Sequence, residues 1–159
     1  MSTLHFTRTT TATPEQFLAA VTDFGPGRSQ IFPNSHDGDL VVHERGEHSA
    51  DVTEGSYGIW ERLQYDWSDP NRIVMTTTDS NIWGGHSGHT YALTALPDGT
   101  TRVDVDVVRE GKNLGGRLIG AGVSLLGDRF LGRGLERTIH AVEAHNAEPQ
   151  PPGVGGATP

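Results

Sequence analysis

Hydrophobic and polar residues alternate through most of the first 110 positions, which is the pattern of half-buried β-strands. The clearest case is residues 101–110, where Val103, Val105 and Val107 share one face. Alternation and a high content of β-branched residues predict the other strands. They are residues 2–11, 39–45, 47–53, 58–67, 72–78 and 86–96. Turn sequences such as PDG at 97–99 separate the strands, so we expect antiparallel hairpins.

Short helical segments follow the first strand. Thr13 and Gln16 have the spacing of a capping box, and Pro14 suits the first helical position. The helix that they start ends by the sequence GPG at residues 25–27. Residues 29–32 are a candidate for a second helix, so we expect one or two short helices here.

The last element is a long helix at residues 115–146, which contains no proline and has apolar residues at steps of three, four and seven. From Leu135 onward the helix is amphipathic, whereas residues 118–131 are apolar nearly all round. Such a surface predicts that the first half of the helix is buried on more than one side.

Seven glycines lie between positions 115 and 134 of this helix, and each costs about 1 kcal/mol relative to alanine. One interpretation is close packing of the helix backbone against a sheet, with a break or kink near Gly127. The other is functional, because small residues leave room for a ligand or let the first half of the helix move as a gate. The sequence leaves both interpretations open.

The element order predicts an α+β fold, with a curved antiparallel sheet of six to seven strands wrapped around the long C-terminal helix. Half-buried antiparallel strands need a cover on one face, and only this helix is long enough to supply it. A twisted sheet around one helix does not close tightly at both ends, so we expect a cavity between them. The domain spans residues 1–146, and residues 147–159, rich in proline and glycine, are expected to form a disordered tail.

Composition and charge exclude several classes of protein. A net charge of −8 without a basic patch argues against a nucleic-acid partner. The absence of cysteine excludes disulfides and cysteine-ligated metals, and fits a cytoplasmic location. The N-terminal sequence lacks the pattern of a secretory signal, and the longest apolar run is too short for a membrane span.

No cofactor and no metal site are expected. His86 and His89 are three positions apart in a predicted strand, so their side chains point to opposite faces. Gly120 and Gly122 fall inside a helix, whereas a dinucleotide-binding fingerprint opens one after a strand. No phosphate-binding loop of the Walker type is present.

Six stretches of the sequence match the pattern of a known family. They are FTR at 6–8, TPE at 13–15, WSDPNRI at 67–73, YAL at 91–93, GTTRV at 99–103 and the helix end at 135–143. They resemble the START-like, Bet v 1-type helix-grip superfamily, and within it the polyketide cyclase/dehydrase-like (SRPBCC) proteins. The resemblance covers about residues 3–146 and implies the helix-grip fold. Members of the superfamily include lipid carriers, hormone receptors and aromatase/cyclases, so the resemblance says little about chemistry.

Polar residues occupy several positions on the predicted inner face of the sheet. Glu61 and His89 are the candidates for a catalytic acid–base pair, because an inward carboxylate must be paired, protonated or hydrated. Tyr65 and Tyr91 are candidates for hydrogen bonds to a ligand carbonyl. The alternative is structural: Glu61 pairs with an arginine at the rim and His89 satisfies a backbone group. The full predicted ligand-binding set is Glu61, Leu63, Tyr65, Met75, Trp83, His89, Tyr91, Leu93, Leu118, Leu126 and Phe130.

Three functions compete on this basis. The leading prediction is a protein that binds a small hydrophobic molecule, lipid-, polyketide- or aromatic-like, between the sheet and the C-terminal helix. The first alternative is a cofactor-free cyclase, aromatase or dehydratase. The second is a protein-interaction module, with a homodimer left open, in which the cavity is vestigial and the aromatic side chain of Trp60 marks a contact surface.

Overall fold

A computed structural model of the chain describes residues 1–147. Of the tail predicted at 147–159, Ala147 is the last residue of a helix, and the rest lies outside the described residues. Seven antiparallel strands form one sheet in the order β1-β7-β6-β5-β4-β3-β2. The strands are β1 (Ser2–Thr10), β2 (Val41–Arg45), β3 (Ser49–Ser56), β4 (Ile59–Asp66), β5 (Arg72–Ser80), β6 (Gly88–Ala95) and β7 (Thr101–Arg109). The helices are α1 (Pro14–Val21), α2 (Arg28–Ile31), α3 (Leu114–Ala147) and the short 3-10 helix η1 (Asp37–Asp39). The predicted α+β architecture is confirmed, with η1 as an unpredicted addition.

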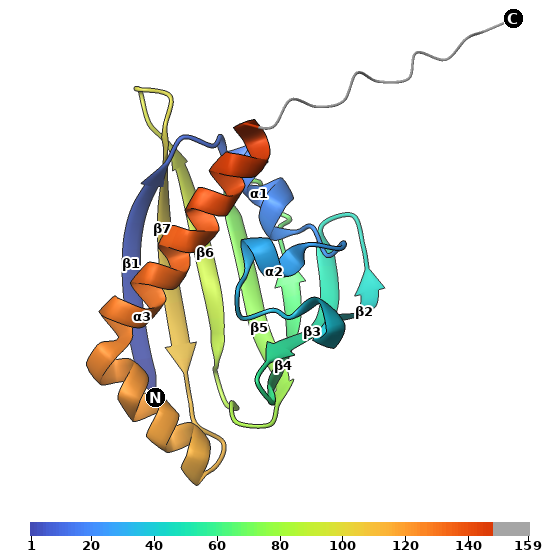
Figure 1. The fold of residues 1–159 in the computed structure, drawn as a ribbon, viewed down its shortest axis with the longest axis vertical. Coiled ribbons are helices and arrows are strands. Elements are labelled where there is room, and N and C mark those ends of the chain that lie inside the picture. Colours follow the sequence, from blue (N-terminus) through green and yellow to red (C-terminus); the bar gives the residue numbers. More distant parts are fainter. Residues whose placement is uncertain (148–159) are drawn as a thin grey trace, which may run out of the picture.

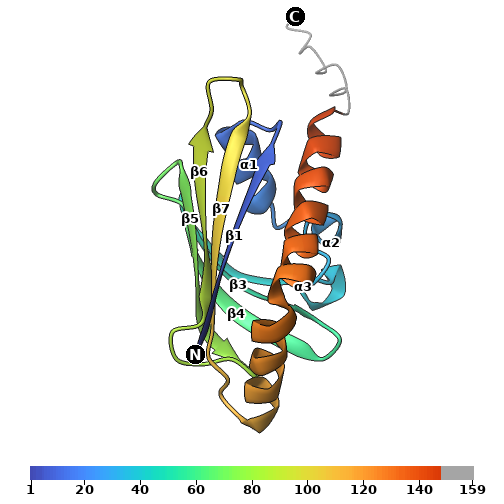
Figure 2. The same cartoon turned by 90° about the vertical axis from the view of Figure 1, so that its left-hand side faces the viewer.

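The helices gather on one face of the curved sheet, as Figures 1 and 2 show. The start of α1 has the predicted capping box, in which Thr13 and Gln16 exchange side chain to backbone hydrogen bonds of 2.9 and 3.2 Å. After α1 the chain turns into α2, and both helices contact the C-terminal half of α3. Together they cover the upper part of the concave face in Figure 1.

The core fills the space between the concave face and the C-terminal half of α3. The buried stripe of α3 packs on the sheet and consists of Leu135, Ile139 and Val142. Phe17 of α1 contributes a ring that is completely buried and that packs near Tyr91. The large strand residues of the core are Phe6, Val52, Leu63, Tyr65, Ile73, Met75, Leu93, Val103, Val105 and Val107.

The N-terminal half of α3 differs from the prediction. It was expected to be buried on more than one side, and this is wrong, because its large apolar side chains are 40 to 84% exposed. These side chains are Leu114, Leu118, Ile119, Leu125, Leu126 and Phe130. The helix is continuous from Leu114 to Ala147, and its ribbon changes direction in the orange part of Figure 1.

Glycines make the contacts of this half with the rest of the protein. Gly116 lies so close to the backbone oxygen of Ile82 that an added Cβ would collide with it. A Cβ on Gly127 would come within 2.8 Å of Leu4 in β1. The close-packing interpretation is therefore confirmed for these two glycines. Within residues 1–147, none of the helices has the length and apolar content needed to cross a bilayer.

Candidate functional site

A buried arginine–carboxylate pair joins β4 and β7 on the concave face. Arg109 donates from Nη1 to Oε1 of Glu61 at 2.7 Å and from Nη2 to Oε2 at 3.2 Å. Thr77 of β5 donates its hydroxyl hydrogen to the same carboxylate. Only 12 and 11% of the Arg109 and Glu61 side chains are exposed. The structural alternative is therefore right that Glu61 pairs with an arginine, but wrong that His89 satisfies a backbone group, because the His89 ring contacts Arg109.

His89 of β6 completes this group. Nε2 of His89 lies 2.7 Å from Nη2 of Arg109, and because a guanidinium can only donate, Nε2 accepts and Nδ1 carries the ring proton. Burial, together with the positive charge of Arg109, lowers the pKa of His89 well below 6.5. His89 is therefore a neutral acceptor at physiological pH.

An aromatic ring covers the arginine. The Arg109 guanidinium carbon lies 5.1 Å from the centre of the Trp83 ring, which is a cation–π distance. Trp83, one of the predicted ligand-binding residues, is 93% buried beside β7 and is held by an isolated bridge to Gly111. We name Glu61, Thr77, Trp83, His89 and Arg109 the Arg109 cluster.

A second buried cluster lies beside the first on the same face. Arg28 of α2 donates to Oε2 of Glu54 at 3.1 Å and to the hydroxyl oxygen of Tyr65 at 3.0 Å, and Tyr65 in turn donates to Glu54. The Arg28 guanidinium also lies 4.5 Å from the Phe24 ring centre and 4.6 Å from that of Phe32. These contacts fasten α2 to the middle of the sheet.

The phenol groups on this face keep their protons. Burial, reinforced by the nearby Glu54 carboxylate, raises the pKa of Tyr65 well above 10, and the same two causes raise the pKa of Tyr91 to about 12. Both hydroxyls therefore remain hydrogen-bond donors over the physiological pH range.

Apart from Trp83, the predicted ligand-binding residues fall into two groups. The strand residues Glu61, Leu63, Tyr65, Met75, His89, Tyr91 and Leu93 share the inner face of the sheet, and Leu63, Met75 and Leu93 are buried in the core. The helix residues Leu118, Leu126 and Phe130 are not brought together with them into a closed wall. They are exposed, because glycines on the other side of α3 make its contacts. Their role in binding stays a prediction.

Sequence reasoning missed three charged residues of the two clusters. Arg109 continues the inward series of β7 by one step beyond Val107, so the alternation itself contained the signal. Glu54 likewise follows Val52 on β3, but the predicted strand ended one residue too early. Arg28 is the first residue of α2, a helix of only four residues, which is too short for a periodic pattern to mark a buried position.

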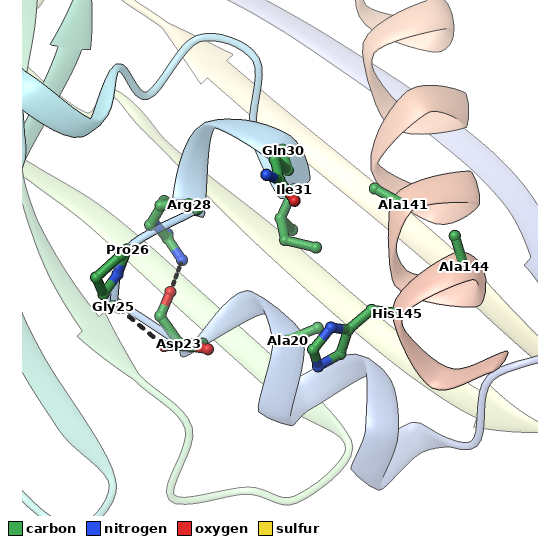
Figure 3. Close-up of a pocket in the computed structure, with 11 residues that line it drawn as sticks. Ala20, Asp23, Gly25, Pro26, Arg28, Gln30, Ile31, Ala141, Ala144 and His145 are labelled. Carbon is green, nitrogen blue, oxygen red and sulfur yellow. Dashed lines mark hydrogen bonds between the residues drawn. The ribbon is translucent and has the colours of Figure 1, made fainter. Parts of the chain in front are cut away.

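Two of the hollows on the described part of the molecule lie against the helices. The smaller, about 190 Å³, lies where α1, the start of α2 and the end of α3 meet, and Figure 3 shows Asp23, Gln30 and His145 around it. The larger, about 420 Å³, lies between the sheet and the first half of α3. Its lining residues are Met1, Ser2, Arg109, Gly111, Arg117, Gly120, Ala121, Ser124 and Leu125. Only the larger reaches the size usual for a small-molecule pocket, about 300–1,000 Å³.

Comparison with solved structures identifies the fold. No protein-family model matches the sequence, and no curated protein does. The protein TTHA0849 of Thermus thermophilus is similar to this chain with a TM-score of 0.68 at 15% identity, covering 92% of this chain and 100% of its own. A START superfamily protein of Mycobacterium smegmatis has a TM-score of 0.66 at 17% identity, covering 90% and 95%.

A third similar structure is the Zhui aromatase/cyclase of a Streptomyces species, with a TM-score of 0.65 at 18% identity over 91% of this chain and 92% of its own. Identities this low establish the fold and leave the function to be argued from the site. The chain shares the helix-grip fold of these solved structures, which is the fold that the resemblance in its sequence implied.

Proposed function

We propose that the protein binds a small hydrophobic molecule carrying an acidic or carbonyl oxygen, in the larger hollow between the sheet and the first half of α3. The observation that carries the proposal is the presence of Arg109 in the wall of this hollow. The opposite walls come from α3, where Leu125 and Ala121 supply apolar surface. Ser2, Arg117 and Ser124 add polar groups to the wall, and polar groups placed beside apolar surface are what orient a ligand in a small-molecule site.

Arg109 has hydrogen-bonding capacity left for a ligand. A guanidinium has five N–H donors, and its bonds to Glu61 and His89 use three. Nε of Arg109 has no partner among the described residues. No buried side-chain nitrogen or oxygen there lacks a partner, so Nε is open to solvent. Nε of Arg109 can therefore donate a hydrogen bond to a ligand oxygen.

The Arg109 cluster also fixes the direction of this donor. Glu61, His89 and the Trp83 ring hold the guanidinium in one orientation before any ligand arrives, which lowers the entropy cost of binding. Buried ion pairs of this kind contribute little net stability compared with apolar residues of similar volume. Their presence in the core is therefore better explained by recognition than by folding.

The same geometry favours binding over acid–base catalysis. Both catalytic candidates, Glu61 and His89, are engaged with Arg109, and a cyclase or dehydratase of this design would need one of them free to exchange protons. A cofactor-free enzyme thus remains the second candidate. The interaction module has its own supporting observation, the exposed first half of α3. We also propose that the protein is cytoplasmic, as its sequence predicted.

Native mass spectrometry of the protein purified from its own host tests the proposal first, because a stoichiometric small molecule would reveal the chemical class of the ligand. The second test titrates an anionic apolar fluorophore, anilinonaphthalene sulfonate, into the wild type and the double variant Arg109→Gln/Glu61→Gln, in which no buried carboxylate is left unpaired. We expect the double variant to bind about tenfold more weakly, the usual effect of losing one charge-assisted hydrogen bond.

The matched control is Arg102→Gln on the exposed face of the same strand, where the arginine contacts only Asp104. The control should bind the fluorophore as the wild type does. An empty protein that takes up no apolar probe, or equal losses in the two arginine variants, would contradict the proposal.

A further inference from the structure

The first half of α3 presents an apolar face to solvent that nothing in residues 1–147 covers. Six large side chains on it are 40 to 84% exposed. Each large apolar side chain contributes roughly 60–120 Å² of apolar surface, the area that corresponds to about 1.5–3 kcal/mol on burial, so the face amounts to a few hundred Å². Contiguous apolar patches of this extent mark interaction surfaces on soluble domains.

Two glycines run along the middle of this face. Gly115 and Gly122 are one heptad apart and exposed, and a Cβ on Gly122 would meet nothing within 4 Å. They therefore differ from Gly116 and Gly127, which the protein's own packing requires. Each exposed glycine still costs about 1 kcal/mol of helix stability. A groove flanked by apolar ridges is what a second helix packs into.

The positions of the six apolar side chains identify the second helix. They are symmetric about Gly122: Ile119 and Leu125 at three residues, Leu118 and Leu126 at four, and Leu114 and Phe130 at eight. Two copies of the helix crossing antiparallel at Gly122, related by a two-fold axis, would bring each of these pairs face to face. A surface that matches itself under a two-fold rotation is the signature of an isologous dimer.

The polar residues agree with this geometry. Arg129, seven residues after Gly122, would lie over Gly115 of the second copy, seven residues before it, where the absence of a side chain leaves room. A protein interface usually has an apolar centre and a polar rim, and arginine is enriched in it. A standard interface buries about 800 Å² per partner, and this face supplies most of the apolar share.

The other occupants fit less well. The twelve residues after Ala147 contain one large aliphatic side chain, Val154, and cannot cover six apolar positions. Leu114 also lies about 50 Å from Ala147 along the helix, beyond the reach of about 40 Å of twelve extended residues. An anionic bilayer would repel a chain of net charge −8.

We propose that the protein is a two-fold symmetric dimer, held by antiparallel contact of the first halves of two α3 helices that cross at Gly122. The proposal does not depend on ligand binding. Dimer formation explains both the exposed leucines and the exposed glycines of α3. It also leaves Arg109 and the concave face of each copy free, and Leu125 is the one residue that belongs both to the dimer face and to the wall of the larger hollow.

Sedimentation equilibrium tests the dimer. Leu118→Glu should raise the dimer dissociation constant at least about 30-fold, the effect of losing a hot-spot residue. The control is Val41→Glu, which changes an apolar residue of edge strand β2 that is 49% exposed and lies outside the face. It should dimerise like the wild type. A monomeric wild type at 100 μM or equal behaviour of the two variants would overturn the proposal, and so would a monomeric wild type that binds anionic vesicles through Leu118.

Cysteine cross-linking tests the register, because the chain has no cysteine of its own. Leu118→Cys mixed with ¹⁵N-labelled Leu126→Cys should form a disulfide between the two species on mild oxidation. Leu118→Cys alone should not, because the two copies of position 118 would be about 12 Å apart. Gly134→Cys, also on α3 with open space around it, is the partner for the control mixture. Efficient linkage in the control mixture, or none in the first, would refute the antiparallel crossing.

Discussion

Glu54 of β3 and Glu61 of β4 are direct cross-strand partners, and both side chains point into the concave face. Like charges in this position destabilise a sheet unless each is neutralised. Here each carboxylate has its own arginine: Arg28 approaches Glu54 from α2, and Arg109 approaches Glu61 from β7. Two elements far apart in sequence are thus tied to the same point of the sheet.

Removing one arginine tests whether each buried carboxylate depends on its own arginine. Arg109→Leu leaves the buried Glu61 carboxylate without its counter-charge beside Glu54, and we expect it to lower the free energy of unfolding by about 3–5 kcal/mol. The double variant Arg109→Leu/Glu61→Leu should recover most of the loss, because no unpaired charge remains. Urea unfolding of the four proteins in this cycle measures the coupling. A double variant as unstable as the single one would show that the pair matters for packing and not for charge.

The pair formed by Arg28 and Glu54 depends on the hydroxyl group of Tyr65. Tyr65→Phe removes the hydroxyl that bonds both Arg28 and Glu54, and should cost about 1–3 kcal/mol, since buried partners are left unsatisfied. Tyr91→Phe is the matched control on the next but one strand, because its hydroxyl bonds no other residue of the described chain. Chemical denaturation of both variants should give a clearly larger loss for Tyr65. Equal losses would mean that ring packing, and not the hydrogen-bonded cluster, sets the stability.

The strands and helices could be predicted because their periodicity is local. The alternation at Val103, Val105 and Val107 and the capping box at Thr13 each need only a few neighbouring residues to be read. The fold then followed from element order, since only one helix was long enough to cover the sheet. The partners of Glu61 could not be predicted in the same way, because Arg109 is 48 residues away and only the sheet register brings them together.

The first half of α3 shows a different limit. A segment such as residues 118–131, apolar nearly all round, predicts burial, yet pattern alone does not say whether the cover comes from the same chain. Gly116 and Gly127 take the intramolecular face, so Leu118 and Leu125 are left outside. Helical periodicity reports where apolar residues lie on a helix. It does not report that glycine, without a side chain, has taken the place next to the sheet.

The buried imidazole predicts a pH dependence of stability. Burial and Arg109 lower the pKa of His89 in the folded protein well below its ordinary value of 6.5. The unfolded chain therefore binds a proton first as pH falls, and the contribution of His89 to stability, complete above pH 6.5, is lost as pH drops toward the folded-state pKa. The slope contributed by this group approaches about 1.4 kcal/mol per pH unit.

Urea unfolding between pH 7.5 and 5.5 measures this slope, and the range stays above most carboxylate titrations. His89→Gln keeps an acceptor for Arg109 but cannot be protonated, so it should show a shallower dependence than the wild type. The stabilities of the two proteins should converge as pH falls. Parallel curves would show that His89 does not differ in protonation between the folded and unfolded states.

The glycines of α3 predict opposite effects for the same substitution. Gly116→Ala places a Cβ against the backbone oxygen of Ile82, which cannot move aside as a flexible side chain can, so we expect a loss of about 1–3 kcal/mol. Gly134→Ala meets nothing within 4 Å and should stabilise the protein by about 0.5–1 kcal/mol through helix propensity. Thermal unfolding of the two variants at equal concentration compares them directly. If both stabilised the protein, the contact between α3 and the segment at Ile82 would be looser than described, and the first half of α3 would be free to move away from the sheet.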